Sequence, residues 1–467
     1  MTAEPRGRWK ASGYAVMVPL DRAQGVVYHT ATRHLLLVRG ELWDNLRRLS
    51  LGDRRNVFRA ASLSATKDEW ELLRTHRIIV SPAEDERLFA RYIVNSMKFS
   101  SSQMAIYISF TSRCNFACSY CYQDFRQGRA PSDLTPKRWK SLFGFIVKRV
   151  DEVGVRRLSV TLYGGEPLLA LDAVLRACHD LKSLESSGCR VHIALITNGS
   201  LLSPAVWRDL EPYVEFVQVT VDGNRETHDR SRPFANGSGS YDVILENTTT
   251  LVRQTPGRLA IRVNVQPNTL SGVQELLATL DTMRMQSALA AVGFHAVEPT
   301  QQQICTGVYN AHDEIQIASE LGELFVTAAS MGFPVTKSYE VGPCMYTASN
   351  SLVVDERLRL YQCPALLYWR PVGRLNPQGR AELGWEWYEG VGYEPRCALS
   401  REYGPICHGG CRAMTGSWKH IECQKRFFDV ALENLIKAYV IARHKIGLVG
   451  KMDKGITTSL GGEKNDG

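Results

Sequence analysis

Cysteine is the residue type whose number and spacing most clearly predict chemistry in this sequence. There are 12 cysteines among 467 residues, and none lies in the first 113. Three of them, Cys114, Cys118 and Cys121, fall within eight consecutive positions, and six more lie between Cys344 and Cys423. In a long chain, clustered cysteines more often bind metal or do redox chemistry than form a disulfide framework.

The first cluster has the spacing C-x3-C-x2-C within the text TSRCNFACSYCY. Three thiolates on one short loop can bind three corners of a four-iron cluster, which leaves one iron open for a ligand from outside the protein. A zinc site would need a fourth Cys or His close by, and this loop has none. We therefore predict an iron–sulfur site with an open iron, and a zinc knuckle is the alternative.

The second cluster contains Cys344, Cys363, Cys397, Cys407, Cys411 and Cys423. Six thiolates cannot fully ligate two four-iron clusters. A zinc-ribbon-like site is the alternative, since His408 stands beside Cys407. Of the remaining cysteines, we interpret Cys178 and Cys189 as buried or inert thiols.

The elements around the first cluster predict an α/β fold. Apolar, β-rich segments alternate with amphipathic helical patterns such as 138–153 and 171–184. Such alternation is typical of a parallel sheet covered by helices, which right-handed crossovers close into a barrel or part of one. Catalytic residues then belong at the C-terminal ends of the strands. The predicted strands are 105–110, 157–163, 192–197, 216–221, 260–265 and 291–297.

The two ends of the chain show other patterns. Three short strands within 14–38 and helices at 41–49 and 67–76 predict a small α+β domain. Beyond residue 335, short strands at 351–356 and 358–363 mix with Gly, Pro and Cys before a helix at 427–446. We predict domains at 1–95, 104–310 and 335–448, followed by a disordered tail at 449–467.

The text CNFACSYC resembles the signature of radical S-adenosylmethionine (SAM) enzymes. Further motifs similar to that family's follow at the ends of predicted strands: GGEP at Gly164–Pro167, TNG at Thr197–Gly199, TVDG at Thr220–Gly223, and THDRSRP with Arg232. The resemblance covers roughly residues 104–300. It implies a partial (βα)6 TIM-type radical SAM barrel, with SAM and one [4Fe-4S] cluster on Cys114, Cys118 and Cys121 as the catalytic centre.

The resemblance also implies a set of SAM contacts. Paired glycines let the backbone approach the methionyl group closely, a carboxylate accepts from its ammonium, and short polar side chains suit the ribose or carboxylate. An arginine suits a carboxylate as a planar fork, and an aromatic side chain before the third cysteine faces the adenine. These residues are Tyr120, Gly164, Gly165, Glu166, Thr197, Asn198, Thr220 and Arg232.

The second cluster resembles the SPASM domain, an extension of radical SAM enzymes that holds two auxiliary [4Fe-4S] clusters. The resemblance implies that Cys344, Cys363 and Cys411 serve the nearer cluster, with Cys305 as the candidate for an additional ligand, and that Cys397, Cys407 and Cys423 serve the outer one. Two positions depart from the family pattern: Ser400 replaces a cysteine, and Leu358 replaces a glycine. We therefore predict two auxiliary clusters, at least one of them incompletely ligated by cysteine.

Composition and charge exclude several classes. Hydrophobic residues make up 44% and charged residues 22%, as in a globular protein, and the net charge of +8 is too small to predict nucleic-acid binding. No apolar run could span a membrane and no signal peptide is evident, so we expect a cytoplasmic location. Residues 1–60 contain eleven Lys/Arg and five Asp/Glu, which is +6 of that charge.

The N-terminal pattern is similar to the winged-helix peptide-recognition element of ribosomal-peptide biosynthesis. That similarity implies binding of an acidic leader peptide as an added strand. A structural cap over the barrel is the alternative. We interpret His295 as a core histidine, with substrate contact as the alternative, and Glu298 as a candidate at the barrel mouth.

Together these features predict a radical SAM/SPASM peptide maturase. A 5′-deoxyadenosyl radical would abstract hydrogen from a ribosomally made precursor peptide and so install a crosslink or related modification, with electrons from a donor such as flavodoxin or ferredoxin. One alternative is an anaerobic sulfatase-maturing enzyme, which places an Asp after the second SPASM cysteine where this chain has Pro364. The other is a non-catalytic iron–sulfur protein for electron transfer or peptide binding.

Overall fold

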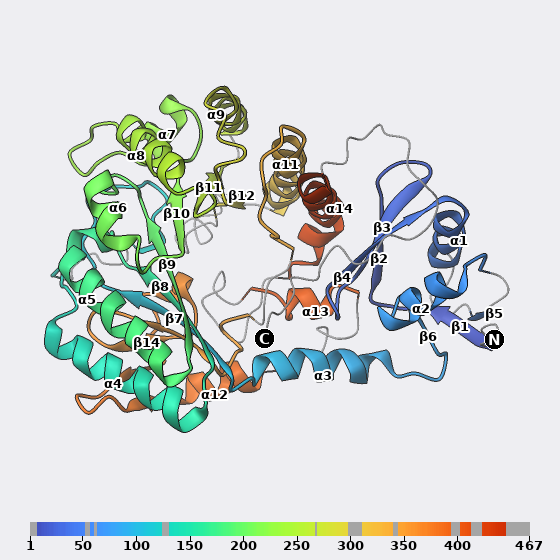
Figure 1. Ribbon diagram of the computed structural model, residues 1–467, viewed down its shortest axis with the longest axis horizontal. Coiled ribbons are helices and arrows are strands. Elements are labelled where there is room, and N and C mark those ends of the chain that lie inside the picture. Colours follow the sequence, from blue (N-terminus) through green and yellow to red (C-terminus); the bar gives the residue numbers. More distant parts are fainter. Residues whose placement is uncertain are drawn as a thin grey trace.

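The structure, a computed structural model, describes residues 7–51, 57–59, 63–123, 130–266, 269–297, 311–339, 344–393, 402–411 and 423–444. Figure 1 shows two lobes, one built around a long sheet and one formed by the N-terminal part of the chain, with helix α3 (Glu86–Lys98) running between them. Within the described residues, no helix is long and apolar enough to cross a membrane.

The larger lobe has, among the described residues, a sheet of ten strands in the order β12-β11-β10-β9-β8-β7-β13-β14-β15-β16. Its first six strands in chain order pair in parallel with their neighbours. All six were predicted from the sequence, and the α/β partial-barrel class is confirmed. They are β7 (Gln103–Ser109), β8 (Arg157–Tyr163), β9 (Arg190–Thr197), β10 (Phe216–Thr220), β11 (Leu259–Val265) and β12 (Ala291–Ala296).

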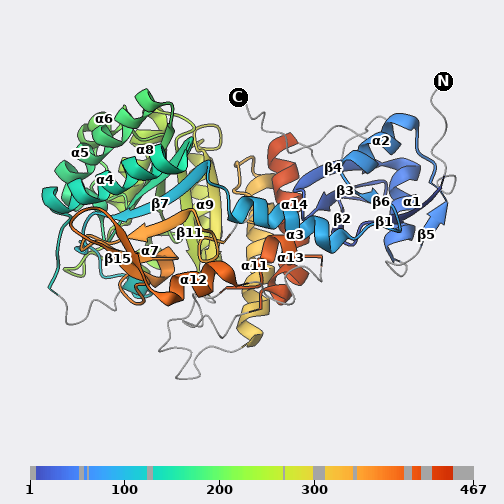
Figure 2. The same ribbon diagram turned by 90° about the horizontal axis from the view of Figure 1, so that it is seen from below.

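Helices between these strands cover the outer face of the sheet (Figures 1 and 2). In β8, Leu158, Val160 and Leu162 are buried toward the helices, whereas Ser159 and Thr161 between them face the other side. This alternation leaves a polar inner face. The helices are α4 (Pro136–Val153), α5 (Leu171–Lys182), α6 (Pro204–Leu210), α7 (Arg225–Ser231), α8 (Tyr241–Gln254) and α9 (Leu270–Thr282), with 3-10 turns η3 (Pro167–Ala170) and η4 (Ser183–Ser187).

The N-terminal lobe contains the three predicted strands as an antiparallel sheet and also a second sheet that the sequence did not predict. The second sheet consists of very short strands without clear alternation, which explains why the pattern was missed. The order of the first sheet is β2-β3-β4 and that of the second is β5-β1-β6. The elements are β1 (Arg8–Ala11), β2 (Ala15–Pro19), β3 (Gln24–His29), β4 (His34–Arg39), α1 (Gly40–Leu51), β5 (Val57–Arg59), α2 (Lys67–Thr75) and β6 (Ile79–Val80).

Helix α3 links the two lobes. The side chain of Asp85 caps its start by accepting from the backbone N–H groups of Arg87 and Leu88, at 3.0 and 3.2 Å. At its other end, Lys98 Nζ donates to the carbonyl of Tyr393 at 3.3 Å. The domain boundary predicted at residue 95 falls inside this helix.

The C-terminal strands continue the barrel sheet, which the sequence did not predict. Strand β13 pairs in parallel with β7, with Val353 opposite Tyr107, and the next three strands follow antiparallel. All four residues of β13 are buried, as an internal strand requires. The elements are α11 (Ala311–Ser330), β13 (Ser351–Val354), β14 (Arg359–Tyr361), η5 (Pro364–Leu366), β15 (Gly373–Leu375), β16 (Ala381–Leu383), α12 (Trp385–Gly392), α13 (Gly404–Cys407) and α14 (Lys425–His444).

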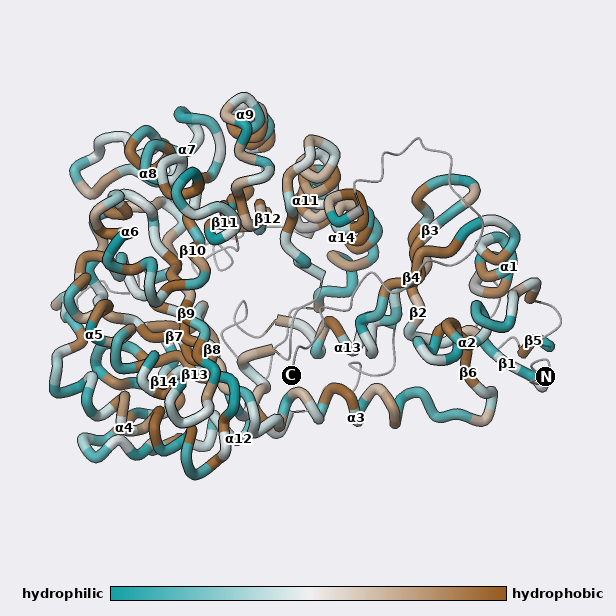
Figure 3. Tube along the Cα trace, viewed as in Figure 1, coloured by the Kyte–Doolittle hydropathy of each residue, from teal (hydrophilic) through white to brown (hydrophobic). Residues whose placement is uncertain are grey.

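Helices α11 and α14 pack together between the lobes, and α14 also contacts β2. The ring of Tyr339 lies 5.3 Å from that of Tyr28 in β3 and 6.0 Å from that of Tyr439 in α14, both edge-on. Figure 3 shows hydrophobic residues along β3 and β4 and on both helices. The core of the barrel lobe therefore extends into the N-terminal sheet.

Candidate active site

The three cysteines of the first cluster lie on the loop that follows β7. Cys114, Cys118 and Cys121 are partly buried. The backbone N–H of Cys121 donates to the carbonyl of Cys118 at 3.2 Å, and that of Phe116 donates to Cys114 Sγ at 3.5 Å. An N–H directed at sulfur favours the charged thiolate, the form that binds metal.

The donor set fits an iron–sulfur cluster. Burial raises the pKa of Cys118 to about 11, Arg232 opposes this, and the charges of Cys121 and Cys114 add to it, so the thiol keeps its proton until a metal displaces it. Among the described residues, no three His, Cys, Asp or Glu side chains converge on one point that could hold a metal ion.

The glycines of the GGEP segment follow β8 and pack against the start of the cysteine loop. A Cβ on Gly165 would lie 2.1 Å from the carbonyl oxygen of Arg113, and one on Gly164, whose φ is +142°, would lie 2.6 Å from that of Thr111. The N–H of Gly165 donates to the Thr111 carbonyl at 2.9 Å, and that of Glu166 donates to the Arg113 carbonyl at 2.8 Å. Both glycines are therefore required by this backbone contact, and their contact with SAM stays a prediction.

Glu166 joins the ends of β8 and β9. Its carboxylate is fully buried and accepts from Thr197 Oγ1 at 2.8 Å and from the N–H of Asn198 at 2.7 Å. It also accepts from the N–H of Leu168 at 3.0 Å. Burial raises the pKa of Glu166, and these hydrogen bonds oppose the rise. In this arrangement Glu166 positions the strand ends, and a direct contact with the SAM ammonium would require its side chain to move.

Asn115, which follows the first cysteine, ties the loop to the end of β9. Its Oδ1 accepts from Asn198 Nδ2 at 2.8 Å, and its Nδ2 donates to Ser200 Oγ at 2.9 Å. Asn198 is 7% exposed and Asn115 half-buried, so water competes little for these bonds. The end of the third predicted strand thus holds the cysteine loop in place.

Tyr120 lies at the centre of a second network. Its hydroxyl donates to Asp222 Oδ2 and accepts from Arg232 Nη1 at 2.7 Å and from Asn264 Nδ2 at 3.0 Å. Asp222 also accepts from the N–H of Asn264 at 2.9 Å. Burial raises the pKa of Asp222, opposed by the Arg232 charge. This network joins the cysteine loop to the ends of β10 and β11, close to the buried side chain of Thr220.

Arg232, directly after helix α7, is in contact with the cysteine loop. Its guanidinium lies 5.7 Å from the ring centre of Phe116, and the loop N–H groups of Ala117 and Ser119 donate to the carbonyls of Pro233 and Ser231 at 2.9 and 3.0 Å. Arg232 Nε is buried and has no hydrogen-bond partner within the described residues. A buried donor without a partner is costly, so this atom fits an oxygen of a bound ligand.

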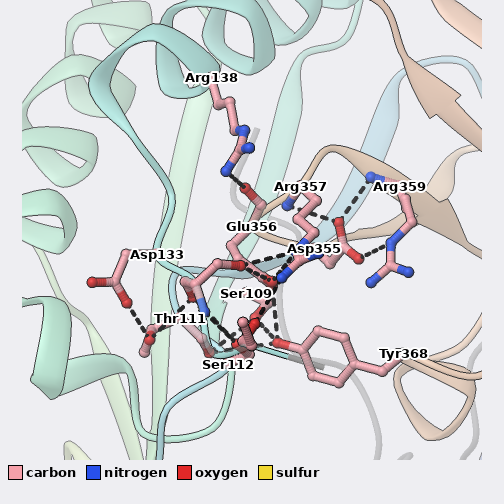
Figure 4. A network of polar contacts seen from close by, with 12 residues as sticks. Ser109, Thr111, Ser112, Asp133, Arg138, Asp355, Glu356, Arg357, Arg359 and Tyr368 are labelled. Carbon is pink, nitrogen blue, oxygen red and sulfur yellow. Dashed lines mark hydrogen bonds and ion pairs between the residues drawn. The ribbon is translucent and has the colours of Figure 1, made fainter. Parts of the chain in front are cut away.

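The C-terminal hairpin β13–β14 contacts the strand that leads into the cysteine loop (Figure 4). Tyr368 Oη donates to Glu356 Oε2 at 3.1 Å and lies 2.7 Å from Ser109 Oγ, the last residue of β7. Ser132 Oγ donates to Glu356 Oε1 at 2.6 Å. Glu356 is 1% exposed, and burial raises its pKa. The C-terminal part of the chain therefore helps to position the cysteine loop.

Leu358, which replaces the glycine of the SPASM pattern, has a left-handed backbone. Its φ is +65°, while its side chain is 6% exposed. Asp355 stabilises this turn, since its Oδ1 accepts from the N–H groups of Arg357 and Arg359 at 2.9 and 2.8 Å. The turn keeps the conformation that suits glycine, and leucine bears the strain in exchange for a buried side chain.

The described cysteines of the second cluster differ in exposure. Cys344, Cys363, Cys407 and Cys411 are partly buried, and Cys423 is exposed. Three positions of the prediction, Cys305, Cys397 and Ser400, lie outside the described residues, as do Glu298 and the tail 449–467. Which of these thiols share a cluster stays a prediction.

Residues 108–280 match the model of the radical SAM superfamily. The chain therefore contains a radical SAM domain. The matched range starts in β7, includes all three cysteines of the loop and ends in α9, so it contains the loop and the Glu166, Asn115 and Tyr120 networks but not the C-terminal hairpin.

Several curated relatives of this radical SAM protein are known. An uncharacterised protein of Methanocaldococcus jannaschii is 22% identical over 59% of this chain and 90% of its own length. The serine-type anaerobic sulfatase-maturating enzyme of Klebsiella aerogenes is 24% identical over 64% of this chain and 77% of its own. The radical SAM cyclopropyl synthase TigE of Paramaledivibacter caminithermalis is 21% identical over 33% of this chain and only 35% of its own.

Solved structures share the fold of this radical SAM chain. Native anSMEcpe with bound AdoMet and a Cp18Cys peptide superposes with a TM-score of 0.57 at 18% identity, over 72% of this chain and 99% of that one. Streptococcus suis SuiB bound to S-adenosylmethionine has a TM-score of 0.51 at 14% identity, over 89% of this chain and 100% of that one. The two matches confirm the predicted fold class.

Sequence reasoning missed Asn115, Asp222 and Asn264 as residues of the site. Asp222 stands inside the quoted TVDG segment, so its position one residue before a glycine and just past a strand end was a usable signal. Asn264 falls within the predicted strand 260–265 at an inward position. For Asn115, the sequence offers no signal beyond its position directly after Cys114.

Proposed function

We propose that the chain is a radical SAM peptide maturase, which uses a 5′-deoxyadenosyl radical to take hydrogen from a carbon of a ribosomally made precursor peptide. When bound, the [4Fe-4S] cluster would supply the electron that cleaves SAM. The observation that carries the proposal is the cysteine loop, which contacts the ends of β8, β9, β10 and β11 through Gly165, Asn115 and Tyr120.

The residues of this chain would bind, orient and shield SAM. Arg232 Nε is a buried donor that no described residue engages, so it can donate to a ligand oxygen, and Tyr120 offers its ring beside the third cysteine. The other predicted contacts, Gly164, Thr197, Asn198 and Thr220, surround the same loop at strand ends. Because most of these side chains are buried, they supply fixed dipoles in place of water.

We propose peptides as the substrate class because of what the names of similar proteins say they bind or modify. The structure of anSMEcpe contains a peptide, and the names of two other relatives describe a sulfatase-maturating enzyme and a cyclopropyl synthase. We further propose that residues 1–95 bind the leader of the precursor. The free edges of the β2-β3-β4 sheet, which has no fourth strand among the described residues, and the local charge of +6 support an acidic, extended leader.

A sulfatase-maturing activity is the second candidate. The Klebsiella relative aligns over 326 residues, which cover 64% of this chain. Against it, Pro364 follows Cys363 and begins the turn η5, where that subfamily's pattern has an aspartate. The residue that distinguishes this chain from that subfamily is thus a proline, whose side chain cannot accept or give up a proton as an aspartate can.

Coexpression tests these candidates directly. The chain would be produced with the short open reading frame beside its gene and, separately, with a sulfatase carrying a Ser or Cys at its modification site. Loss of hydrogen or a new crosslink in the short peptide, found by mass spectrometry, supports the maturase. A formylglycine in the sulfatase and an unchanged short peptide would overturn it.

Iron content tests the auxiliary clusters. After anaerobic reconstitution, three four-iron sites predict about 8–12 iron atoms per chain. A value near that of one cluster would remove the auxiliary clusters from the proposal while leaving the radical chemistry intact.

A further inference from the structure

The cysteine loop has a base at which its two ends are paired. Thr111 at the start and Asp133 at the end form an antiparallel bridge, and Thr111 Oγ1 donates to Asp133 Oδ1 at 2.5 Å. The N–H of Ser112 donates to the carbonyl of Ser132 at 3.0 Å, and the N–H of Ser132 donates to Ser112 Oγ at 2.9 Å. These four residues are the base of the cysteine loop, and Cys114 lies two residues beyond it.

One carboxylate from the turn between β13 and β14, that of Glu356, is bonded toward both sides of this base. Its Oε1 accepts from Ser132 Oγ at 2.6 Å, and its Oε2 accepts from Tyr368 Oη at 3.1 Å. Tyr368 Oη in turn lies 2.7 Å from Ser109 Oγ and 3.5 Å from the carbonyl oxygen of Thr111. Figure 4 shows Glu356 and Tyr368 beside these two residues. Glu356 therefore reaches the start of the loop through Tyr368 and its end through Ser132.

The chemistry of the groups fixes the direction of these hydrogen bonds. A carboxylate only accepts, so the hydroxyls of Ser132 and Tyr368 both direct their protons at Glu356. Arg357 Nε donates to Ser132 Oγ at 3.0 Å, which leaves the proton of that hydroxyl for the carboxylate. Since the proton of Tyr368 is also used, its oxygen accepts from Ser109 Oγ. Glu356 is 1% and Tyr368 3% exposed, so water competes little for these bonds.

The base of the loop is also where the glycine segment packs. The carbonyl of Thr111 accepts from the N–H of Gly165 at 2.9 Å, and a Cβ on Gly164 would lie 3.1 Å from Ser109 Oγ. A shift of the base would therefore move both the glycines predicted to contact SAM and the first cysteine of the loop.

We propose that Glu356 is a positioning residue of the radical SAM site, which fixes the base of the cysteine loop through hydrogen bonds from Tyr368 and Ser132. It acts on SAM affinity through the loop rather than on the reacting atoms. This inference rests on the proposed function, because it names a residue outside the matched radical SAM range on which SAM binding depends.

Two substitutions of Glu356 separate hydrogen bonding from packing. Glu356→Leu keeps most of the volume but removes both acceptors, and we expect the dissociation constant of SAM for the reconstituted chain to rise about tenfold. Glu356→Gln keeps an acceptor for Ser132 and offers an N–H to Tyr368 Oη, so the constant should stay within about twofold. The ion pair that glutamine loses, to Arg357 Nε at 3.5 Å, is partly exposed and contributes little.

Isothermal titration with SAM measures both variants. An unchanged dissociation constant in Glu356→Leu would overturn the proposal, and so would an equal loss of affinity in the leucine and glutamine variants. If Glu356→Leu does not fold, Tyr368→Phe and Ser132→Ala replace it, since each removes one of the two links and keeps the carboxylate. SAM affinity should fall severalfold in each, and unchanged affinity in both would overturn the proposal.

Asp355→Asn is the matched control in the same turn. Asp355 is equally buried, and its Oδ2 accepts from Arg359 Nε at 2.6 Å and from Tyr361 Oη at 2.9 Å, both within the hairpin. Asparagine keeps the Oδ1 atom that accepts from the turn, so this variant should unfold at lower urea concentration but retain SAM affinity. A loss of affinity equal to that of Glu356→Leu would show that hairpin stability, and not Glu356, controls SAM binding.

Hydrogen exchange of the loop separates this proposal from the proposed function, because it needs no SAM. The N–H groups of Ala117 and Ser119 donate to the carbonyls of Pro233 and Ser231 at 2.9 and 3.0 Å. Glu356→Leu should raise their exchange rates by about tenfold, and Glu356→Gln should not. If the unaltered chain bound no SAM, the proposed function would fail, whereas these rates would still decide the role of Glu356. Equal rates in the unaltered chain and in Glu356→Leu would overturn that role.

Discussion

The hydroxyl of Tyr120 accepts a hydrogen bond of 2.7 Å from Arg232 Nη1, which links the cysteine loop to the end of helix α7. The same hydroxyl donates to Asp222 and accepts from Asn264. Three buried polar groups from different elements thus depend on one oxygen atom. Because none of them can turn to water, the hydroxyl is a central point of the site.

Replacing Tyr120 by Phe removes that oxygen and keeps the ring. We expect SAM binding to weaken by about tenfold and the free energy of unfolding to fall by about 1–3 kcal/mol, because buried partners lose their hydrogen bonds. Isothermal titration with SAM and urea unfolding measure the two effects. Tyr388→Phe, on a side chain that is 56% exposed, is the control. Unchanged SAM affinity in Tyr120→Phe would contradict the role of the network.

Gly165→Ala should disrupt the cysteine loop. Its Cβ would lie 2.1 Å from the Arg113 carbonyl oxygen, so the backbone must shift next to Cys114. We expect the variant to retain clearly less iron after reconstitution and to unfold at lower temperature. In contrast, a Cβ on Gly144 in α4 meets nothing within 4 Å, and Gly144→Ala should stabilise that helix by about 1 kcal/mol. Equal iron content and stability in the two variants would count against the close contact.

At Leu358, we expect the usual stability order of alanine over glycine substitutions to be reversed. Both Leu358→Ala and Leu358→Gly lose the buried side chain, but only glycine relieves the φ of +65°. We expect the glycine variant to be more stable than the alanine variant by about 1 kcal/mol. Thermal unfolding of the two proteins decides it. An alanine variant that is the more stable of the two would show that the turn is not left-handed.

Acid should destabilise the N-terminal lobe through His29. Its Nδ1 accepts from the N–H of Thr32 at 3.1 Å, and its Nε2 lies 3.1 Å from Ser12 Oγ. Burial, then the charge of Arg77, lowers the pKa of His29 to about 3. The folded state therefore binds fewer protons than the unfolded one, whose histidine has a pKa of about 6.5.

The sign of this effect is fixed by the lowered pKa. The stability that depends on neutral His29 is fully present above about pH 6.5 and falls as the pH drops toward 3, by about 1.4 kcal/mol per pH unit. Urea unfolding of the unaltered chain and of His29→Gln at several pH values measures the slope. The variant should show a shallower loss between pH 6 and 4, and identical slopes would refute the assignment.

The barrel could be predicted from the sequence because its signals are local. Alternation such as RLSVTLY identified the strands, and the GGEP, TNG and TVDG motifs stood at the ends of three of them. Helix ends also have local signals. Helix α4, for example, starts after the N-cap residue Thr135 and ends at Gly154, whose φ is +76°. The cysteine spacing alone identified the loop.

The remaining features depend on contacts between distant segments. That β13 joins the sheet beside β7 follows from packing, since the text SLVV would suit any buried strand. Asn115, Asp222 and Asn264 are common polar residues, and only the parallel pairing of their strands brings them to the loop. Helix α3 was not predicted, and its apolar side chains Leu88 and Tyr92 are exposed rather than packed in a core.

The most direct test is the amount of 5′-deoxyadenosine formed anaerobically from SAM with dithionite. We predict that the reconstituted chain forms it, that Cys118→Ala abolishes it, and that Cys178→Ala, which changes a buried thiol in α5 away from the loop, retains it. Equal formation by the unaltered chain and by Cys118→Ala would contradict the assignment of the cysteine loop as the radical SAM site.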